Sequence, residues 1–325
     1  MRLTRNDPDL LDHRSPELIA RATTIFKRTI WPYHRAEVRG LDRIPRHQGV
    51  IYVGNHNGYP YMTEFYLLTS AIFEKYGMSR YPYILSHDFT LSLPLANQFL
   101  TRYGCVRASR PNAKRVLDLD ECLLIYPGGD EELMRPHRDR ARLKFQGRAG
   151  HVRLALAYDK PIVPVVAVGG HSTALILDDL HWVAQATGAK RKLRVSAWPL
   201  MLSIPWGLTL GPFILPYLPW PSKIIIEVLE PIVFPSASSV GVDEATWVRT
   251  CALRLEGILE DALRRLETER VSNYGLRQLG ERGKRSLRRW GARLFPAVPP
   301  PAATFTSLPS PAPRRPSIDR SQAAG

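Results

Sequence analysis

The stretch GVIYVGNHNG, residues 49–58, does most to decide the fold class of this chain. Its apolar run from Val50 to Val53 has the length and composition of a buried strand, and Gly54 ends the run. His56 therefore follows directly after a predicted strand, where a side chain can project from the edge of a sheet.

Apolar runs of the same kind recur along the chain and alternate with segments of helical periodicity. The segment AEVRGLDRIP at 36–45 predicts a strand and a turn. The apolar runs are YPYILS at 81–86, CLLIYP at 122–127, PIVPVVAVG at 161–169 and KIIIEVLEPIVF at 223–234. A helix is expected from near Pro60 through the segment 60–77. Strands that alternate with helices predict an α/β fold with a mainly parallel central sheet flanked by helices. In such sheets the loops at the strand ends carry the functional site.

Composition and periodicity divide the chain into four regions. Residues 1–35 hold an amphipathic N-terminal helix, which Ser15 caps at its start. Residues 36–240 form one central domain, because 325 residues with 44% hydrophobic content can bury one sizeable core. Residues 241–295 are helical and end in a basic amphipathic part, and residues 296–325 form a disordered Pro-rich tail.

The charge balance of the chain favours anionic partners. Lys+Arg 45 against Asp+Glu 30 gives a net charge of +15, which suits phospholipid head groups, nucleic acid or a polyphosphate cofactor. The sequence shows no nucleic-acid-binding module, so we expect no nucleic-acid partner. Three cysteines without paired spacing predict a reducing compartment and no metal site. The N-terminus lacks the apolar segment of a secretory signal, which predicts a cytoplasmic location.

A segment of 28 residues between Arg194 and Lys223 carries no charge. Its length would suit a membrane span, but its six prolines argue against a continuous helix. We expect a loop that dips into the membrane interface, with Trp198, Trp206 and Trp220 at head-group depth. A proline-rich loop that covers the core without touching lipid is the alternative.

A second candidate for membrane contact is the segment 276–295, which carries seven Lys/Arg and one acid. This pattern is typical of a basic amphipathic helix on anionic lipid, or of a solvated tail. Together the two segments predict a peripheral or monotopic protein whose partner is a lipid surface, on the cytoplasmic face of a membrane.

Four motifs resemble, in order and spacing, those of the glycerolipid acyltransferase family over residues 36–235. The first is GNHNG at 54–58, and the resemblance implies that its His56 is the general base. A base near neutral pKa suits removal of a hydroxyl proton as the oxygen attacks an acyl thioester. Backbone N–H groups near Asn57 and Gly58, or near the later glycine turn, would stabilise the oxyanion.

The sequence departs from the family pattern five residues after His56, where Tyr61 stands in place of an aspartate that would orient the imidazole. Glu64 is the nearest carboxylate, and a helix that begins near Pro60 would lean its side chain back towards His56. A backbone carbonyl, a carboxylate distant in sequence, or no group at all are the alternatives. In the last case the protein would be a degenerate family member that binds lipid without turning it over.

The second and fourth motifs concern the acceptor and the acyl chain. The second runs from Gly104 to Arg110 and is similar to a family element whose arginine contacts the polar part of the acceptor. Arg110 matches that spacing, and Arg107 is the alternative. The fourth, KPIVPV at 160–165, resembles a closing strand of the family, and its Pro164 is expected beside the acyl channel.

The third motif, IYPGGDEE at 125–132, bears on the kind of acceptor. It has Gly128 and Glu131 where phosphate-accepting members have a glutamate and an arginine. Gly128, Gly129 and Glu132 are instead similar to the branch of diacylglycerol acyltransferases and wax-ester or phytyl-ester synthases. The loss of a cation beside new acids favours a neutral acceptor over a phosphorylated one.

The resemblance therefore implies a membrane-associated O-acyltransferase that acts on a glycerolipid or another lipid alcohol. The donor would be acyl-CoA or acyl-ACP, used as a co-substrate, with no bound cofactor. A neutral acceptor of this kind includes diacylglycerol, which would give triacylglycerol. Phospholipid formation from lysophosphatidic acid and acylation of a polar lipid head group or a secondary metabolite are the alternatives within this class. Candidate ligands of the CoA phosphates are Lys114, Arg115, Arg138 and Arg140.

Overall fold

The computed structural model describes residues 5–59, 61–186, 197–211 and 217–274. The helices are α1 Pro16–Arg28, α2 Ile30–Tyr33, α3 Thr63–Tyr76, α4 Asp88–Ser92, α5 Pro94–Arg102, α6 Arg110–Asp118, α7 Gly129–Leu133, α8 Gly150–Ala157, α9 His181–Ala186, α11 Ala237–Val240 and α12 Glu244–Tyr274. The strands are β1 Glu37–Arg39, β2 Ile51–Gly54, β3 Tyr83–Ser86, β4 Cys105–Arg107, β5 Leu123–Ile125, β6 Ile162–Val168, β7 Leu175–Asp178, β8 Leu200–Ser203, β9 Gly207–Leu210 and β10 Ile225–Val228. The predicted basic segment 276–295 and tail 296–325 lie outside the described residues.

The described residues build a central sheet in the order β1-β10-β6-β2-β5-β3-β4. β6, β2, β5, β3 and β4 run parallel to one another, whereas β10 is antiparallel to β6, and β1 is parallel to β10. The mainly parallel α/β sheet expected from the sequence is therefore confirmed. β2 lies at the middle of the order, so its carboxyl end, which leads to His56, is surrounded by other strand ends.

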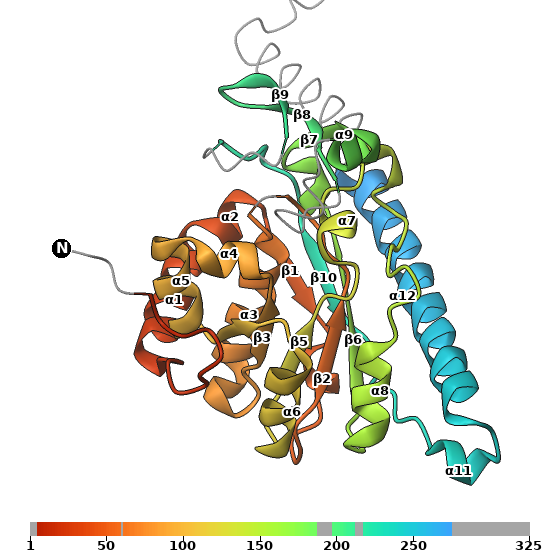
Figure 1. The fold of residues 1–325 in the computed structure, drawn as a ribbon. Coiled ribbons are helices and arrows are strands. Elements are labelled where there is room, and N and C mark those ends of the chain that lie inside the picture. The colour runs from red at the N-terminus through yellow and green to blue at the C-terminus, as the bar shows by residue number, and fades with distance from the viewer. Residues whose placement is uncertain (1–4, 60, 187–196, 212–216, 275–325) are drawn as a thin grey trace, which may run out of the picture. The chain divides into compact units, whose positions relative to one another are not determined.

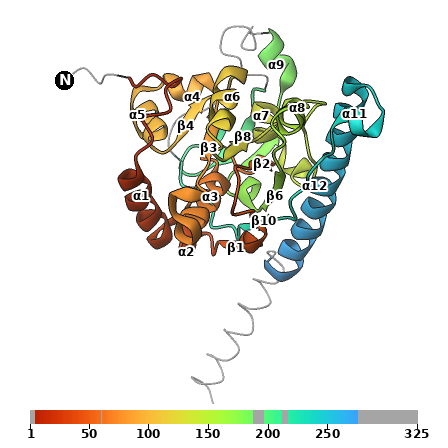
Figure 2. The same ribbon diagram turned by 90° about the horizontal axis from the view of Figure 1, so that it is seen from below.

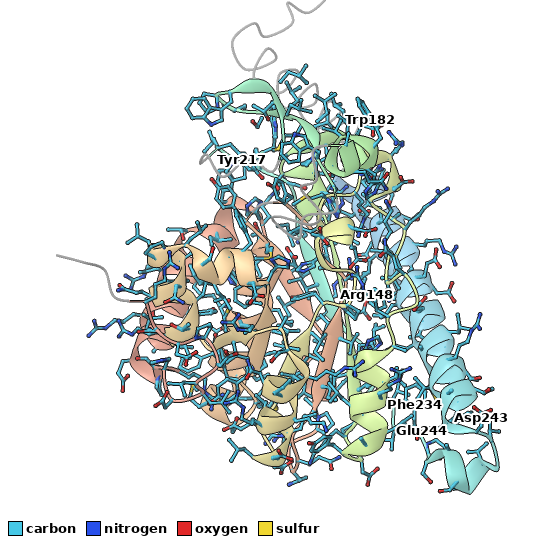
Figure 3. All side chains as sticks on the ribbon, in the orientation of Figure 1. Arg148, Trp182, Tyr217, Phe234, Asp243 and Glu244 are labelled. Atoms are coloured by element: carbon cyan, nitrogen blue, oxygen red, sulfur yellow. The ribbon has the colours of Figure 1, made fainter. Side chains whose placement is uncertain are left out.

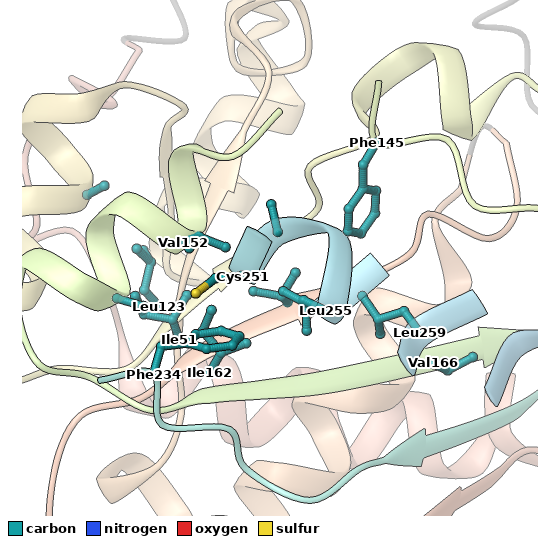
Figure 4. Packing of buried hydrophobic residues seen from close by; sticks show 14 of the residues in the cluster. Ile51, Leu123, Phe145, Val152, Ile162, Val166, Phe234, Cys251, Leu255 and Leu259 are labelled. Carbon is teal, nitrogen blue, oxygen red and sulfur yellow. The ribbon is translucent and has the colours of Figure 1, made fainter. Parts of the chain in front are cut away.

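Helices cover both faces of the sheet, as Figures 1 and 2 show. On one face α1, α3 and α5 contribute to a buried cluster, and on the other face α6, α8 and α12 contribute to a second. Alternation along β2 feeds both clusters, since Ile51 and Val53 face one and Tyr52 the other. In Figure 4 Leu255 of α12 packs near Ile51 in the second of these clusters.

The charge-free segment differs from the loop that the sequence predicts. Where it is described, it forms β8 and β9, which pair with β7 in an antiparallel three-stranded sheet. Apolar residues alternate in facing along the β8–β9 hairpin, and Gly207, with φ of +69°, turns the chain back after Trp206. The prolines lie outside these two strands, which is why they do not interrupt the pairing. Among the described helices, none has the length and apolar character needed to cross a bilayer.

Candidate active site

His56 is held at the end of β2 by asparagine side chains on either side of it. The Asn55 amide accepts a hydrogen bond from the Ala167 N–H (2.8 Å) and donates one to the Ala167 carbonyl (3.0 Å), which continues the β2–β6 pairing by one residue. The Asn57 side-chain oxygen accepts from the Gly170 N–H. A Cβ at Gly170 would lie 2.0 Å from the Asn57 carbonyl oxygen, so only glycine permits this approach. The backbone that carries His56 is therefore fixed to β6 and to the turn after it.

Glu64 lies beside His56 even though the helix that carries it begins later than predicted. α3 begins at Thr63 rather than near Pro60, because Gly58 (φ +112°) and Met62 (φ +45°) turn the chain first. Glu64 is thus in the first turn of α3 and its side chain extends back to the β2 end. Its Oε1 lies 3.4 Å from His56 Nδ1 and accepts the Asn57 N–H at 2.9 Å. A contact of this length is typical of a histidine–carboxylate pair before substrate binds.

Burial sets the ionisation of Glu64. The side chain is 1% exposed, and burial raises the pKa of its carboxyl group. The nearby His56 ring and the Asn57 N–H lower this pKa, but burial has the larger effect. Among the described residues Glu64 Oε2 has no hydrogen-bond partner. The ionised carboxylate therefore costs stability by itself, and a cationic imidazole next to it would offset that cost.

We expect the substitution Glu64→Gln to change how stability depends on pH. Because the folded pKa of Glu64 is raised, the native state holds its proton more tightly than the unfolded state does. The stability contribution of Glu64 is thus greatest below its unfolded pKa and is lost as pH rises through the folded pKa. Thermal unfolding from about pH 4 to about pH 8 should show the glutamine variant gaining Tm relative to wild type as pH rises. A Tm difference that stays constant with pH would contradict the raised pKa.

Tyr126 is a neighbour of His56 that the sequence motifs did not single out. Its ring stacks on the imidazole with centroids 4.4 Å apart and an angle of 18°. The stack requires a glycine in β2, because a Cβ at Gly54 would lie 2.8 Å from Tyr126 Cε1. Tyr126 follows β5, so the parallel neighbour of β2 supplies one wall of the histidine site.

Glu132 lies inside the protein and holds the backbone of the site. Its side chain is fully buried; Oε2 accepts the His56 backbone N–H (2.9 Å) and Oε1 accepts the Lys144 N–H (3.2 Å). Arg135, also fully buried, pairs with the same carboxylate at 3.2 Å, and burial lowers the pKa of Arg135. A Cβ at Gly128 would lie 2.2 Å from Glu132 Oε2, so the glycine in the third motif makes room for this carboxylate. Glu132 thus supports His56, and its predicted contact with the acceptor stays a prediction.

His56 lines a cavity of about 380 Å³ whose walls are mostly apolar. The walls come from the loop before α3, from the helices α3, α4, α5 and α7, from β3, and from the first residue of β4. The apolar lining residues include Met62, Phe65, Ile84, Leu85, Phe89, Leu93, Leu100, Leu133 and Met134. Ser86, His87, Thr90 and Asp130 are the polar side chains among the lining besides the tyrosines and His56. This volume suits part of an extended hydrocarbon chain next to a base.

The two arginines predicted to bind the acceptor are not among the residues that line this cavity. Arg107 forms ion pairs with Asp9 (3.1 Å) and Asp88 (2.9 Å), which attach the N-terminal segment to the sheet. Arg110 is exposed at the first position of α6. Cys105 of the second motif and Gly129 of the third both line the cavity, and the third motif also contacts His56 through the stacked Tyr126 ring.

The structure also places Pro164 and the four cations that were predicted to bind the CoA phosphates. Pro164 is buried in β6 opposite Val53 and is not among the cavity-lining residues. Lys114 and Arg115 are exposed on α6, Arg138 pairs with the Asp178 carboxylate, and Arg140 donates to Glu267 of α12. Contact of these cations with a CoA phosphate stays a prediction.

The predicted oxyanion donors are near His56, but one of them is engaged. The Asn57 N–H donates to Glu64. Gly58 has a positive φ, and a Cβ added at this residue would lie about 3.1 Å from the Gly170 backbone. The Tyr61 hydroxyl bonds to the Tyr217 backbone: it donates to the carbonyl (3.0 Å) and accepts the N–H (2.9 Å). The oxyanion role of Asn57 and Gly58 stays a prediction.

A histidine–carboxylate pair at a strand end beside an apolar cavity is an arrangement that can activate a hydroxyl group next to a hydrocarbon chain. Residues 35–168 match the family described as Acyltransferase, and this range contains His56, Glu64, Tyr126 and Glu132. This part of the chain is therefore similar to acyltransferases.

The chain is also similar to proteins without an established activity. Uncharacterized proteins of Mycobacterium tuberculosis (strain ATCC 25618 / H37Rv) and Mycobacterium leprae (strain TN) are each 29% identical to it over 213 residues, 65% of this chain. The match spans 56% and 54% of those relatives, so the chain corresponds to just over half of their length. Among solved structures, the 1-acyl-sn-glycerophosphate (LPA) acyltransferase PlsC from Thermotoga maritima has a TM-score of 0.46 and 14% identity, over 77% of this chain and 79% of that one.

Proposed function

We propose that the protein transfers a fatty acyl group from an acyl thioester, of coenzyme A or acyl carrier protein, to the hydroxyl of a neutral lipid alcohol. The observation that carries the proposal is the position of His56, with Glu64 at 3.4 Å behind the ring and the apolar cavity in front of it. The cavity accepts a hydrocarbon chain, and the histidine activates the nucleophile at its edge.

The proposed reaction needs no covalent enzyme intermediate. His56 takes the proton of the acceptor hydroxyl as its oxygen bonds to the thioester carbonyl carbon. When the carbonyl re-forms, the carbon–sulfur bond breaks and the leaving thiolate takes the proton from the imidazolium. Glu64 stabilises the imidazolium between these two steps, because a buried carboxylate at this distance favours a cation beside it.

The charge around the cavity supports a neutral acceptor rather than a phosphorylated one. Asp130 lines the cavity, and no lysine or arginine does so among the described lining residues. Arg135, which follows the third motif, is fully buried against Glu132. Arg148 donates hydrogen bonds to the Pro127 and Gly128 carbonyls of the motif (2.8 Å each) and is not among the lining residues. A phosphate in the cavity would meet Asp130 and, among the described lining residues, no lysine or arginine, so we propose a diglyceride-like or long-chain alcohol acceptor at a membrane surface.

Thiol release from acyl-CoA and acyl-ACP tests this proposal. Diacylglycerol, monoacylglycerol and a long-chain alcohol should each be offered separately beside lysophosphatidic acid. We expect a neutral alcohol to stimulate release, with the matching ester as the product.

Stimulation by lysophosphatidic acid alone would overturn the proposed acceptor class and favour a phospholipid-forming enzyme. Folded protein that binds lipid but releases no thiol with any acceptor would show a degenerate, lipid-binding member.

A further inference from the structure

The β8–β9 hairpin exposes a continuous row of apolar side chains. Leu208, Leu210 and Trp206 are 63%, 53% and 46% exposed. Leu202 pairs directly with Leu208 across the hairpin, so the two share one face. The paired Met201 and Thr209 are buried on the opposite face.

This row continues beyond the hairpin. Leu218 is joined to Ile204 by an antiparallel bridge, and both are exposed, as is Trp220. We call this surface the hairpin patch, and it consists of Leu202, Ile204, Trp206, Leu208, Leu210, Leu218 and Trp220. A soluble surface seldom gathers so many large apolar side chains with no charge between them, which indicates a contact surface.

The hairpin patch is joined to the wall of the candidate active site. Tyr217, next to Leu218, donates its hydroxyl to the Tyr59 carbonyl (2.6 Å) and exchanges backbone hydrogen bonds with the Tyr61 hydroxyl. Tyr59 and Tyr61 both line the cavity of His56. Figure 3 shows Tyr217 at the same end of the molecule as β8 and β9. A partner surface that binds the hairpin patch would therefore lie close to the cavity.

The net charge of the chain favours an anionic lipid surface over a second copy of the chain as the partner of the hairpin patch. The chain has a net charge of +15, so two copies repel each other while an anionic bilayer attracts the protein. The two tryptophans of the patch suit the membrane interface, where an aromatic ring and its polar N–H are both accommodated.

We infer that the hairpin patch inserts into the interface of an anionic bilayer and thereby holds the His56 cavity at the lipid surface. This inference rests on the proposed function, because a lipid alcohol would have to pass from the bilayer into the cavity. The membrane contact that the sequence predicts for a loop is thereby placed on a β-hairpin.

A fluorescent probe at position 208 tests the inference in the full chain. The native cysteines Cys105, Cys122 and Cys251 are buried, so Leu208→Cys offers a selective site for an environment-sensitive label. Leu119→Cys is the matched control, because Leu119 is also 63% exposed but lies after α6. Vesicles of phosphatidylcholine with phosphatidylglycerol should shift the emission of the label at 208 to the blue and leave the label at 119 unchanged.

Affinity provides the second measurement. Replacing Trp206 and Leu208 together by threonine should weaken flotation with these vesicles about tenfold or more, while Leu119→Thr leaves it unchanged. Vesicles that bind the protein without shifting the label at 208 would overturn the inference. A blue shift that needs a second copy of the chain and no lipid would also overturn it, in favour of a dimer.

The same variants separate this inference from the proposed function. The Trp206→Thr, Leu208→Thr protein should transfer a short acyl group from its thioester to a water-soluble alcohol at the wild-type rate, because neither residue lines the cavity. Vesicle insertion without any acyl transfer would reject the proposed function and keep the docking surface. Acyl transfer by a protein whose hairpin does not enter lipid would support the proposed function and reject the docking surface.

Discussion

The substitution His56→Ala is expected to reduce acyl transfer by a factor of about 10² to 10⁴, because it would remove the proposed general base. The fold should survive, since Asn55, Asn57 and Glu132 hold the backbone at this position by bonds that do not involve the imidazole. The measurement is kcat for thiol release with the preferred acceptor, together with Tm and vesicle flotation.

His87→Ala is the control for the shape of the cavity, because His87 lines the same cavity while its Nδ1 accepts the Phe89 N–H (3.1 Å), whereas His56 Nδ1 faces Glu64. We expect it to alter kcat by only a few-fold. If His56→Ala keeps most of the activity while folded, the assignment of the base is wrong. If both histidine variants lose activity equally, the loss comes from the cavity and not from a base.

The substitution Glu132→Ala is expected to lower the free energy of unfolding by about 3–5 kcal/mol, because it leaves the fully buried Arg135 without its carboxylate. It also removes the acceptor of the His56 and Lys144 N–H groups. Denaturant unfolding measures the change. Arg138→Ala is the control, since its ion pair with Asp178 is exposed and should be worth less than about 1 kcal/mol.

Gly128→Ala tests the same contact from the other side. Its Cβ would lie 2.2 Å from Glu132 Oε2, so the carboxylate must move off the His56 N–H. We expect a loss of stability in the range of an overpacked core, about 1–3 kcal/mol, and a fall in kcat.

Gly150→Ala is the matched glycine control, because no described atom lies within 4 Å of its added Cβ. Unfolding free energies of Glu132→Ala and Gly128→Ala that stay within about 1 kcal/mol of wild type would show that Glu132 does not support the site.

The sequence predicted the central sheet because its strands are local apolar runs. The runs at 81–86, 122–127, 161–169 and 223–234 each contain a strand of the sheet. β4 was not predicted as a strand, because three residues between two helices give too short a pattern. β8 and β9 were expected as a loop, because prolines obscured an alternation that becomes clear only when the two strands pair.

The surroundings of His56 show where sequence reasoning ends. The order of residues along the chain is enough to place His56 after a buried strand, to make Glu64 the nearest carboxylate after it, and to put Gly128 and Glu132 in one motif. The distance of 3.4 Å between Glu64 and the ring, and the inward turn of Glu132 to the His56 backbone, depend on the packing of the folded chain. The physical reason is that a buried carboxylate must find donors, and which N–H groups and cations are within reach depends on how β2, β5 and α3 pack.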